Sequence, residues 1–109
     1  MSDRLARQNA EITRDADNFV EVGATSVTLE VYQQIVDITS AVGTPTITMP
    51  PVAEAAGRFY SLYVTAYSNA ITIAAGDSID FVAPTFNGAD DGAVLWSDGR
   101  RWWTLTVRT

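Results

Sequence analysis

The feature that most constrains this chain is a succession of short runs of alternating polarity, separated by turn residues roughly every 8–12 positions. From Phe19 onward, runs such as Ser26–Val31 and Thr46–Met49 alternate apolar and polar residues, and Gly, Pro, Asn or Asp punctuates them. A period of two is typical of β-strands, whose successive side chains point to opposite faces. Only Val52–Ala56, between a proline and a glycine, favours a helix, and there is room for a single turn. We therefore predict an all-β fold, a small antiparallel β-sandwich or barrel with a jelly-roll-like topology.

The last two runs predict a β-hairpin. Ala93–Trp96 and Trp102–Val107 flank Ser97-Asp98-Gly99, and all three tryptophans of the chain lie in these runs. An Asp-Gly pair between apolar runs is a strong hairpin signal, because glycine accepts the positive φ of a tight turn. Both faces of this hairpin are apolar, whereas a sheet with one face in water alternates cleanly between apolar and polar residues.

The register of the hairpin stays open at this point. A loop of three residues would place Val94, Trp96 and Trp102 on one face. A loop of two residues would group Val94 and Trp96 with Arg101 and Trp103 instead. A slip of one residue thus exchanges two tryptophans between the faces.

The run Arg58–Tyr67 is also apolar on both faces. One face holds Phe59, Tyr63 and Tyr67 with a serine and a threonine, and the other holds only apolar residues and Tyr60. We interpret one aromatic set as core, namely Phe59, Tyr63, Trp96 and Trp103. We place a second set on the other face, where its members would stack on sugars or pack against sister subunits, namely Tyr60, Tyr67 and Trp102.

Composition narrows the functional classes. The chain of 109 residues suffices for one domain. Its net charge of −6 argues against nucleic-acid binding, and no apolar run approaches the roughly 20 residues of a membrane helix. The N-terminus carries charges where a signal peptide needs an apolar core. Histidine, cysteine and lysine are absent, so the usual catalytic bases, thiols and transition-metal ligands are missing. We expect no enzymatic activity and no cofactor.

Two clusters of polar residues can be interpreted either as turns or as catalytic or metal-binding groups. Asp77 and Asp80 are paired carboxylates, but each stands beside a turn residue, where aspartate ordinarily bonds backbone amides. Asn87–Gly92 offers three oxygen-bearing side chains in a glycine-containing loop. A calcium loop would need ligands at alternate positions and a distal glutamate, and neither is present. We interpret both clusters as turns.

Residues 1–18 differ from the rest of the chain, and we interpret them as an extended N-terminal arm preceding a single β-domain, residues 19–109. They hold three of the seven arginines and only two large apolar residues. A frayed terminus is the alternative. The residues with which the arm would contact a partner are Arg4, Leu5, Arg7, Ile12 and Arg14.

Four segments, in order over roughly 80 residues, resemble a small β-domain of tailed-bacteriophage virion proteins. They are TITMPPVAEAAG (Thr46–Gly57), RFYSLYV (Arg58–Val64), NAITIAAGDSID (Asn69–Asp80) and SDGRRWW (Ser97–Trp103). The chain departs from the pattern at Phe81, where glycine is usual, and at Arg100-Arg101, which replace uncharged turn residues. Such domains occur in capsid decoration (cement) proteins and in tail or head fibres.

The resemblance implies a structural virion protein, usually a homotrimer. At this length we expect a decoration protein that binds the major capsid protein on the outer capsid surface after assembly in the host cytoplasm. It would bridge capsomers and stabilise the head. The alternative is a receptor- or carbohydrate-binding module of a fibre, with a glycan as ligand. We assign the subunit interface to Tyr60, Leu62, Tyr67, Arg100, Arg101 and Trp102, and the capsid contact to the arm residues.

Overall fold

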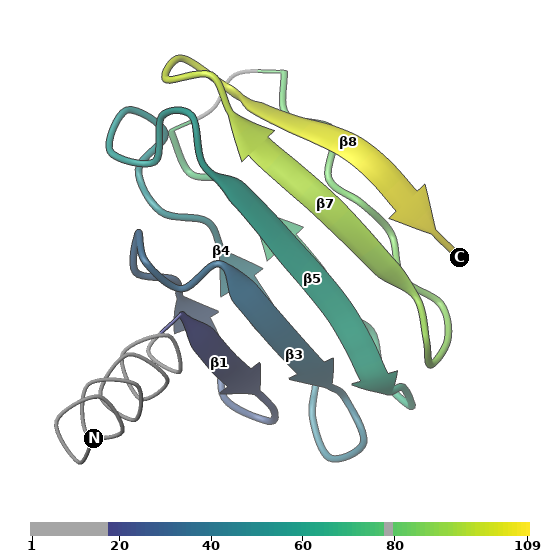
Figure 1. Ribbon diagram of the computed structural model, residues 1–109. Helices are drawn as coiled ribbons and strands as arrows, with labels where there is room; N and C mark the ends of the chain where they lie inside the picture. Colours follow the sequence, from purple (N-terminus) through teal and green to yellow (C-terminus); the bar gives the residue numbers. More distant parts are fainter. Residues whose placement is uncertain (1–17, 78–79) are drawn as a thin grey trace, which may run out of the picture.

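A computed structural model describes residues 18–77 and 80–109, which fold into two β-sheets (Figure 1). The five-stranded sheet has the order β1-β3-β5-β7-β8 and the three-stranded sheet the order β2-β4-β6. Neither sheet closes into a barrel. The strands are β1 (Phe19–Val22), β2 (Val27–Thr28), β3 (Ile35–Thr39), β4 (Thr46–Thr48), β5 (Phe59–Ala66), β6 (Thr72–Ala74), β7 (Gly92–Ser97) and β8 (Trp102–Arg108).

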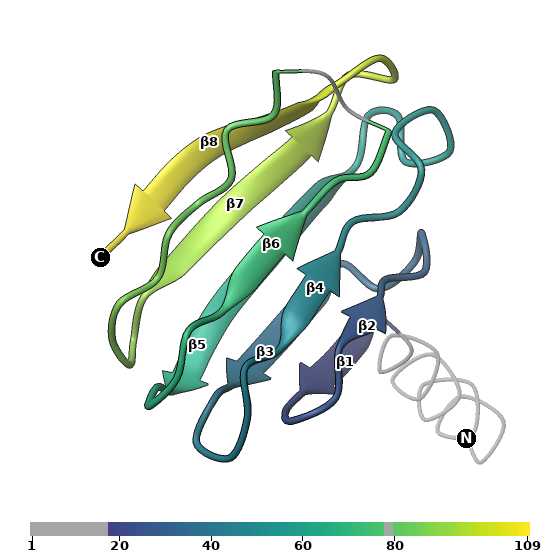
Figure 2. The same ribbon diagram turned by 180° about the vertical axis from the view of Figure 1, so that it is seen from behind.

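From β1 to β6 the chain alternates between the sheets, and Figure 2 shows β2, β4 and β6 running in front of the larger sheet. Each return adds a strand parallel to the previous one in the same sheet, so β1, β3 and β5 pair in parallel, as do β2, β4 and β6. The result is a stack of coils, as in a parallel β-helix. The predicted all-β class is confirmed, but the parallel pairing from β1 to β6 contradicts the expected purely antiparallel, jelly-roll-like topology.

Strand pairing in the larger sheet changes from parallel to antiparallel after β5. β7 pairs with β5 in antiparallel fashion, and β8 pairs with β7 in the predicted hairpin. The loop has four residues, Asp98–Arg101, since Ser97 pairs with Trp102. Gly99 has a φ of 92°, a conformation that favours glycine. A register shift beside Leu95 marks a bulge in this pair.

Two shorter segments have different outcomes. Residues 51–57 form the single helical turn that was expected, in which the Ala55 N–H donates to the Pro51 carbonyl at 3.1 Å. Residues 80–82, which follow the turn at Gly76-Asp77, form no strand. Asp80 there has a φ of 62°, which is incompatible with an extended strand.

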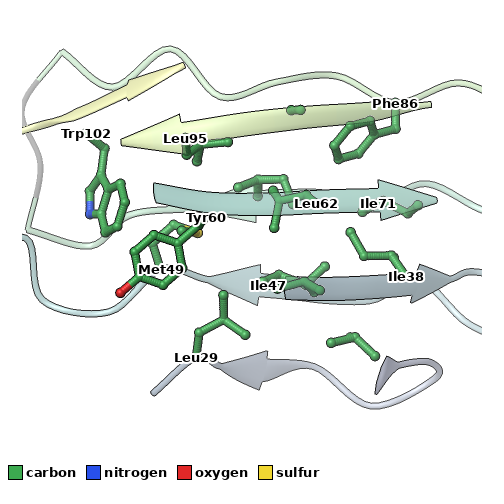
Figure 3. Close-up of a cluster of buried hydrophobic side chains, with 14 of the residues drawn as sticks. Leu29, Ile38, Ile47, Met49, Tyr60, Leu62, Ile71, Phe86, Leu95 and Trp102 are labelled. Atoms are coloured by element: carbon green, nitrogen blue, oxygen red, sulfur yellow. The ribbon is translucent and has the colours of Figure 1, made fainter. Parts of the chain in front are cut away.

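The core lies between the two sheets (Figure 3). The inner face of the larger sheet contributes Val36, Ile38, Tyr60, Leu62, Val64 and Leu95, and the smaller sheet and its flanks contribute Leu29, Ile47, Met49 and Ile73. The two buried serine side chains are bonded to backbone. Ser40 Oγ accepts from the N–H groups of Ser68 and Asn69, and Ser97 Oγ donates to the Val52 carbonyl at 2.6 Å.

Candidate interaction face

The outer face of the five-stranded sheet is turned away from the core, and it carries large apolar side chains in contact with solvent. Five of them have exposed fractions between 38% and 55%, namely Phe19, Ile35, Phe59, Tyr63 and Trp103. Val94 and Trp96 on β7 are half-buried on the same face. Contiguous apolar surface on a folded domain marks an interaction site. This face is therefore the candidate functional site.

One end of the face is a row of three aromatic rings. The strand register places Phe59, Trp96 and Trp103 opposite one another on β5, β7 and β8. The rings of Phe59 and Trp96 stack with their centroids 6.3 Å apart, and the Arg101 guanidinium lies 3.7 Å from the centroid of the Trp103 ring. Stacking and cation–π contacts hold these rings in defined positions.

The hairpin loop fixes the last ring of this row through Asp98. Its carboxylate accepts the Trp103 indole N–H at 2.9 Å and the backbone N–H groups of Arg100 and Arg101 at 2.7 and 2.8 Å. The indole and backbone hydrogen bonds favour the charged carboxylate, so the pKa of Asp98 is lowered to about 2. The loop is therefore ordered around an ionised side chain.

The opposite end of the face is polar. The register aligns Glu21, Asp37, Tyr63, Gly92 and Arg108 across all five strands. The Tyr63 hydroxyl donates to the carboxylate of Asp90, and this hydrogen bond raises the pKa of the phenol above its ordinary value. The face therefore changes from aromatic to charged along the strands.

The structure corrects the predicted subunit interface. Tyr60, Leu62 and Trp102 are 0%, 1% and 2% exposed and belong to the core, so they offer no surface to a partner. The Tyr60 hydroxyl donates to the Val31 carbonyl at 2.6 Å, and its ring contacts the Trp102 ring edge-on at 5.2 Å between centroids. Tyr67 is half-buried against the core. Arg100 is exposed, and Arg101 lies over Trp103.

The aromatic side chains predicted as core lie on the outer face. Phe59, Tyr63 and Trp103 are exposed and Trp96 is half-buried. The grouping of Trp96 with Trp103 agrees with the two-residue-loop alternative, although the loop has four residues, because both lengths preserve the parity of the register. Trp96 and Trp103 therefore share a face, as one of the two alternatives predicted, but this face is the outer one and not the core.

Several residues of this face were missed, namely Phe19, Glu21, Ile35, Asp37, Val94 and Arg108. A signal for them was present in Arg58–Tyr67, because only one face of that strand contains serine and threonine, at Ser61 and Thr65. The face without serine or threonine is the buried one. The pairing of β3 and β7 with β5 then determines which of their side chains lie on the outer face. That step requires knowing that β3 pairs with β5 in parallel.

The arm residues Arg4, Leu5, Arg7, Ile12 and Arg14 lie outside the described residues.

The two polar clusters bind backbone. Asp77 accepts the Val52 N–H at 3.0 Å and so caps the helical turn. Asp91 is 6% exposed, and its carboxylate accepts the N–H groups of Asn87 and Gly88 at 2.7 and 3.1 Å. Within residues 18–77 and 80–109, no three acidic side chains gather where they could hold a metal ion.

A groove of about 640 Å³ lies beside the edge strand β8. Its walls include Trp103 and Arg101 from the hairpin and Asp80 and Pro84 from the segment between β6 and β7. The Thr104 hydroxyl joins the two walls by donating to the Val82 carbonyl at 2.8 Å. The groove combines one exposed indole with charged and hydroxyl groups.

Comparisons with known proteins give no relative. No protein-family model matches the chain, and neither a curated protein nor a solved structure is significantly similar to it. In the described part of the chain, no helix has the length and apolar character needed to cross a membrane.

Proposed function

We propose that this protein is a non-enzymatic decoration protein of a tailed-bacteriophage capsid, a homotrimer that binds the outer capsid surface and bridges capsomers. The observation that carries the self-association is the apolar outer face, where Phe59 is 55% and Ile35 52% exposed. Aromatic residues together with arginine are enriched at protein–protein interfaces. The resemblance of four ordered segments to phage virion domains supplies the viral context.

The charge and the chemistry of the chain agree with a structural role. The net charge of −6 disfavours nucleic acid as a partner. The carboxylates Asp77 and Asp91 serve backbone amides, so they are engaged in holding loops. In this proposal the arm, residues 1–18, attaches the trimer to the major capsid protein, and the β-domain forms the trimer.

Deletion of residues 1–18 tests the capsid part of the proposal. The truncated protein should keep its circular dichroism spectrum and its trimeric mass by light scattering, and it should no longer sediment with capsids. Full coating of capsids by the truncated protein would show that the arm is not the attachment segment. A monodisperse monomer for the complete chain in dilute solution would contradict the trimer.

The groove beside β8 favours a second function, glycan binding by a fibre module. An exposed indole flanked by Arg101 and Asp80 offers stacking and hydrogen bonds to a sugar ring. Under this alternative Trp103→Ala abolishes binding on a glycan array and leaves the oligomer intact. Trp102 is not the residue to test, because it is buried. Retained binding in Trp103→Ala would exclude the groove as the glycan site.

A further inference from the structure

The two halves of the outer face carry opposite charges at one level along the strands. In the polar row, Glu21 on β1 and Asp37 on β3 stand on one side of Tyr63, and Arg108 on β8 stands on the other. Asp90 is bonded to Tyr63 near the middle of the row. At this level the β1–β3 half of the outer face is therefore acidic, and the β7–β8 half is basic.

In the neighbouring row, large side chains lie on the β1–β3 side and a hollow lies on the β7–β8 side. Its β1 and β3 positions are Phe19 and Ile35, which are 44% and 52% exposed. The β5 position is Ser61, and on the other side of it the surface forms a shallow hollow of about 210 Å³. The absence of a side chain at Gly92 opens this hollow between Tyr63 and Arg108. In this row the β1–β3 half therefore protrudes and the β7–β8 half recedes.

A second copy of the chain can complement both the charge difference and the shape difference between the two halves. A symmetry axis parallel to the strands keeps every row at its height and brings the β1–β3 half of one copy against the β7–β8 half of the next. Arg108 then meets Glu21 and Asp37, and Ile35 meets the hollow. An axis across the strands would instead oppose the charged row to the aromatic row at Phe59, leaving charges against apolar rings.

The geometry points to a second copy of this chain as the occupant of the outer face, docked with the symmetry axis parallel to the strands. This inference rests on the self-association in the proposed function and adds the surface and its orientation. In a closed ring each copy offers its acidic half to one neighbour and its basic half to the other. Phe59 and Tyr63, on the central strand β5, then lie nearest the axis.

Engineered cross-linking tests the orientation, and the absence of native cysteine makes it selective. Glu21→Cys and Arg108→Cys are combined in one chain and treated with a short bis-maleimide. The double variant should give covalent trimers on a denaturing gel, and each single variant should stay monomeric. Cross-linking of either single variant as efficiently as the double variant would overturn the orientation.

Charge reversal tests the same contact without a cross-linker. Arg108→Glu opposes like charges, so the association constant from sedimentation should fall about tenfold or more. Adding Glu21→Arg to that variant should restore most of the association. The difference between Arg108→Glu and the wild type should shrink in about 1 M salt, where surface charges are screened. Glu54→Arg, a charge reversal on the exposed turn between β4 and β5, is the matched control and should leave association unchanged.

A substitution at the protruding half tests the apolar contact. Ile35→Asp should lower the association constant about thirtyfold or more, because a charge would enter the hollow. Val42→Asp is the matched control, since Val42 is 80% exposed on the loop after β3, away from the face. Unfolding midpoints of both variants verify that each is folded.

The outcomes separate this inference from the proposed function. A trimer that is insensitive to Arg108→Glu and gives no 21–108 cross-link would overturn the inference and leave the trimer standing. A dimer with the 21–108 cross-link would support the docking face and contradict the trimeric function. A monomer would contradict both.

Discussion

Both faces of the five-stranded sheet carry large aromatic and aliphatic side chains, but only the inner face is buried. On β5, Tyr60 and Leu62 of the inner face are fully buried, while Phe59 and Tyr63 of the outer face are 55% and 44% exposed. Hydrophobicity alone does not separate these faces. The inner face is the one that the smaller sheet covers, and its side chains contribute to folding. The outer face has no cover within the described residues, so its apolar side chains are available for association.

The tryptophan pair on β8 should show the largest difference between the faces. Trp102→Ala removes a fully packed ring and should lower the free energy of unfolding by about 3–5 kcal/mol. Trp103→Ala removes a surface ring with a cation–π contact and a solvent-exposed hydrogen bond to Asp98, and it should cost about 1 kcal/mol or less. Urea denaturation of both variants, under conditions where the wild type is dissociated, checks this. Equal losses would mean that the outer ring is also part of the core.

A tyrosine pair sharpens the comparison to a single hydroxyl group. Tyr60→Phe leaves the Val31 carbonyl without its donor and should cost about 1–2 kcal/mol. Tyr63→Phe loses a solvent-exposed hydrogen bond to Asp90 and should stay within about 0.5 kcal/mol of the wild type. Chemical denaturation at neutral pH checks both values. A larger loss for Tyr63→Phe would reverse the assigned ranking.

The same two phenols predict the alkaline limit of stability. Burial raises the pKa of Tyr60, and the hydrogen bond to Asp90 raises that of Tyr63. Both pKa values are thus higher in the folded than in the unfolded state. The stabilisation is complete below the ordinary value of 10 and declines as the pH rises through the folded pKa values. Tyr60→Phe should flatten this decline in a series of unfolding midpoints. An unchanged decline in that variant would contradict a contribution from Tyr60.

An isoleucine pair on β3 makes the most conservative test. Ile38 is fully buried and Ile35 is 52% exposed, and valine preserves the branching at Cβ in both cases. Ile38→Val should cost about 1 kcal/mol, whereas Ile35→Val should change stability by less than about 0.5 kcal/mol. Thermal unfolding monitored by circular dichroism can resolve this difference. Comparable shifts would show that solvent exposure at Ile35 is not what distinguishes the sites.

The smallest expected effect concerns the loop that anchors the outer row. The pKa of Asp98 is lowered from 3.8 to about 2, so its contribution is present above the ordinary value and is lost as the pH falls through about 2. Asp98→Asn should therefore be less stable than the wild type at about pH 5, with the difference vanishing below about pH 2. NMR titration of the Trp103 indole proton follows the same change. A difference independent of pH would point to geometry and not to charge.

Much of the local structure could be predicted from the sequence. Alternation located the strands from Phe19 to Val107 and grouped Trp96 with Trp103 in one of the two registers considered. It could not say which face was buried, because a period of two defines two faces without ranking them. The ranking depends on which face the second sheet covers.

The topology was harder to predict for a related reason. The stacked positions Val27, Ile47 and Ile73 are separated by intervals of unequal length, so the coils do not read as a sequence repeat. Parallel pairing also requires a crossover through the other sheet, which no short-range turn signal encodes. The interaction face was equally hard to predict from the sequence, because its rows combine residues from five strands.

The position of β5 between parallel and antiparallel neighbours has a consequence for biosynthesis. During translation β1 and β3 leave the ribosome before β5, the strand that joins them to the hairpin. Parallel pairs between distant segments form slowly. We therefore expect the nascent chain to remain unfolded until the segment through Ser97 has emerged, with the aromatic outer face and the core appearing together. Released chains that end before Gly92 should be degraded by protease, and chains that end at Thr109 should resist it; resistance of the shorter chains would show that the parallel coils fold by themselves.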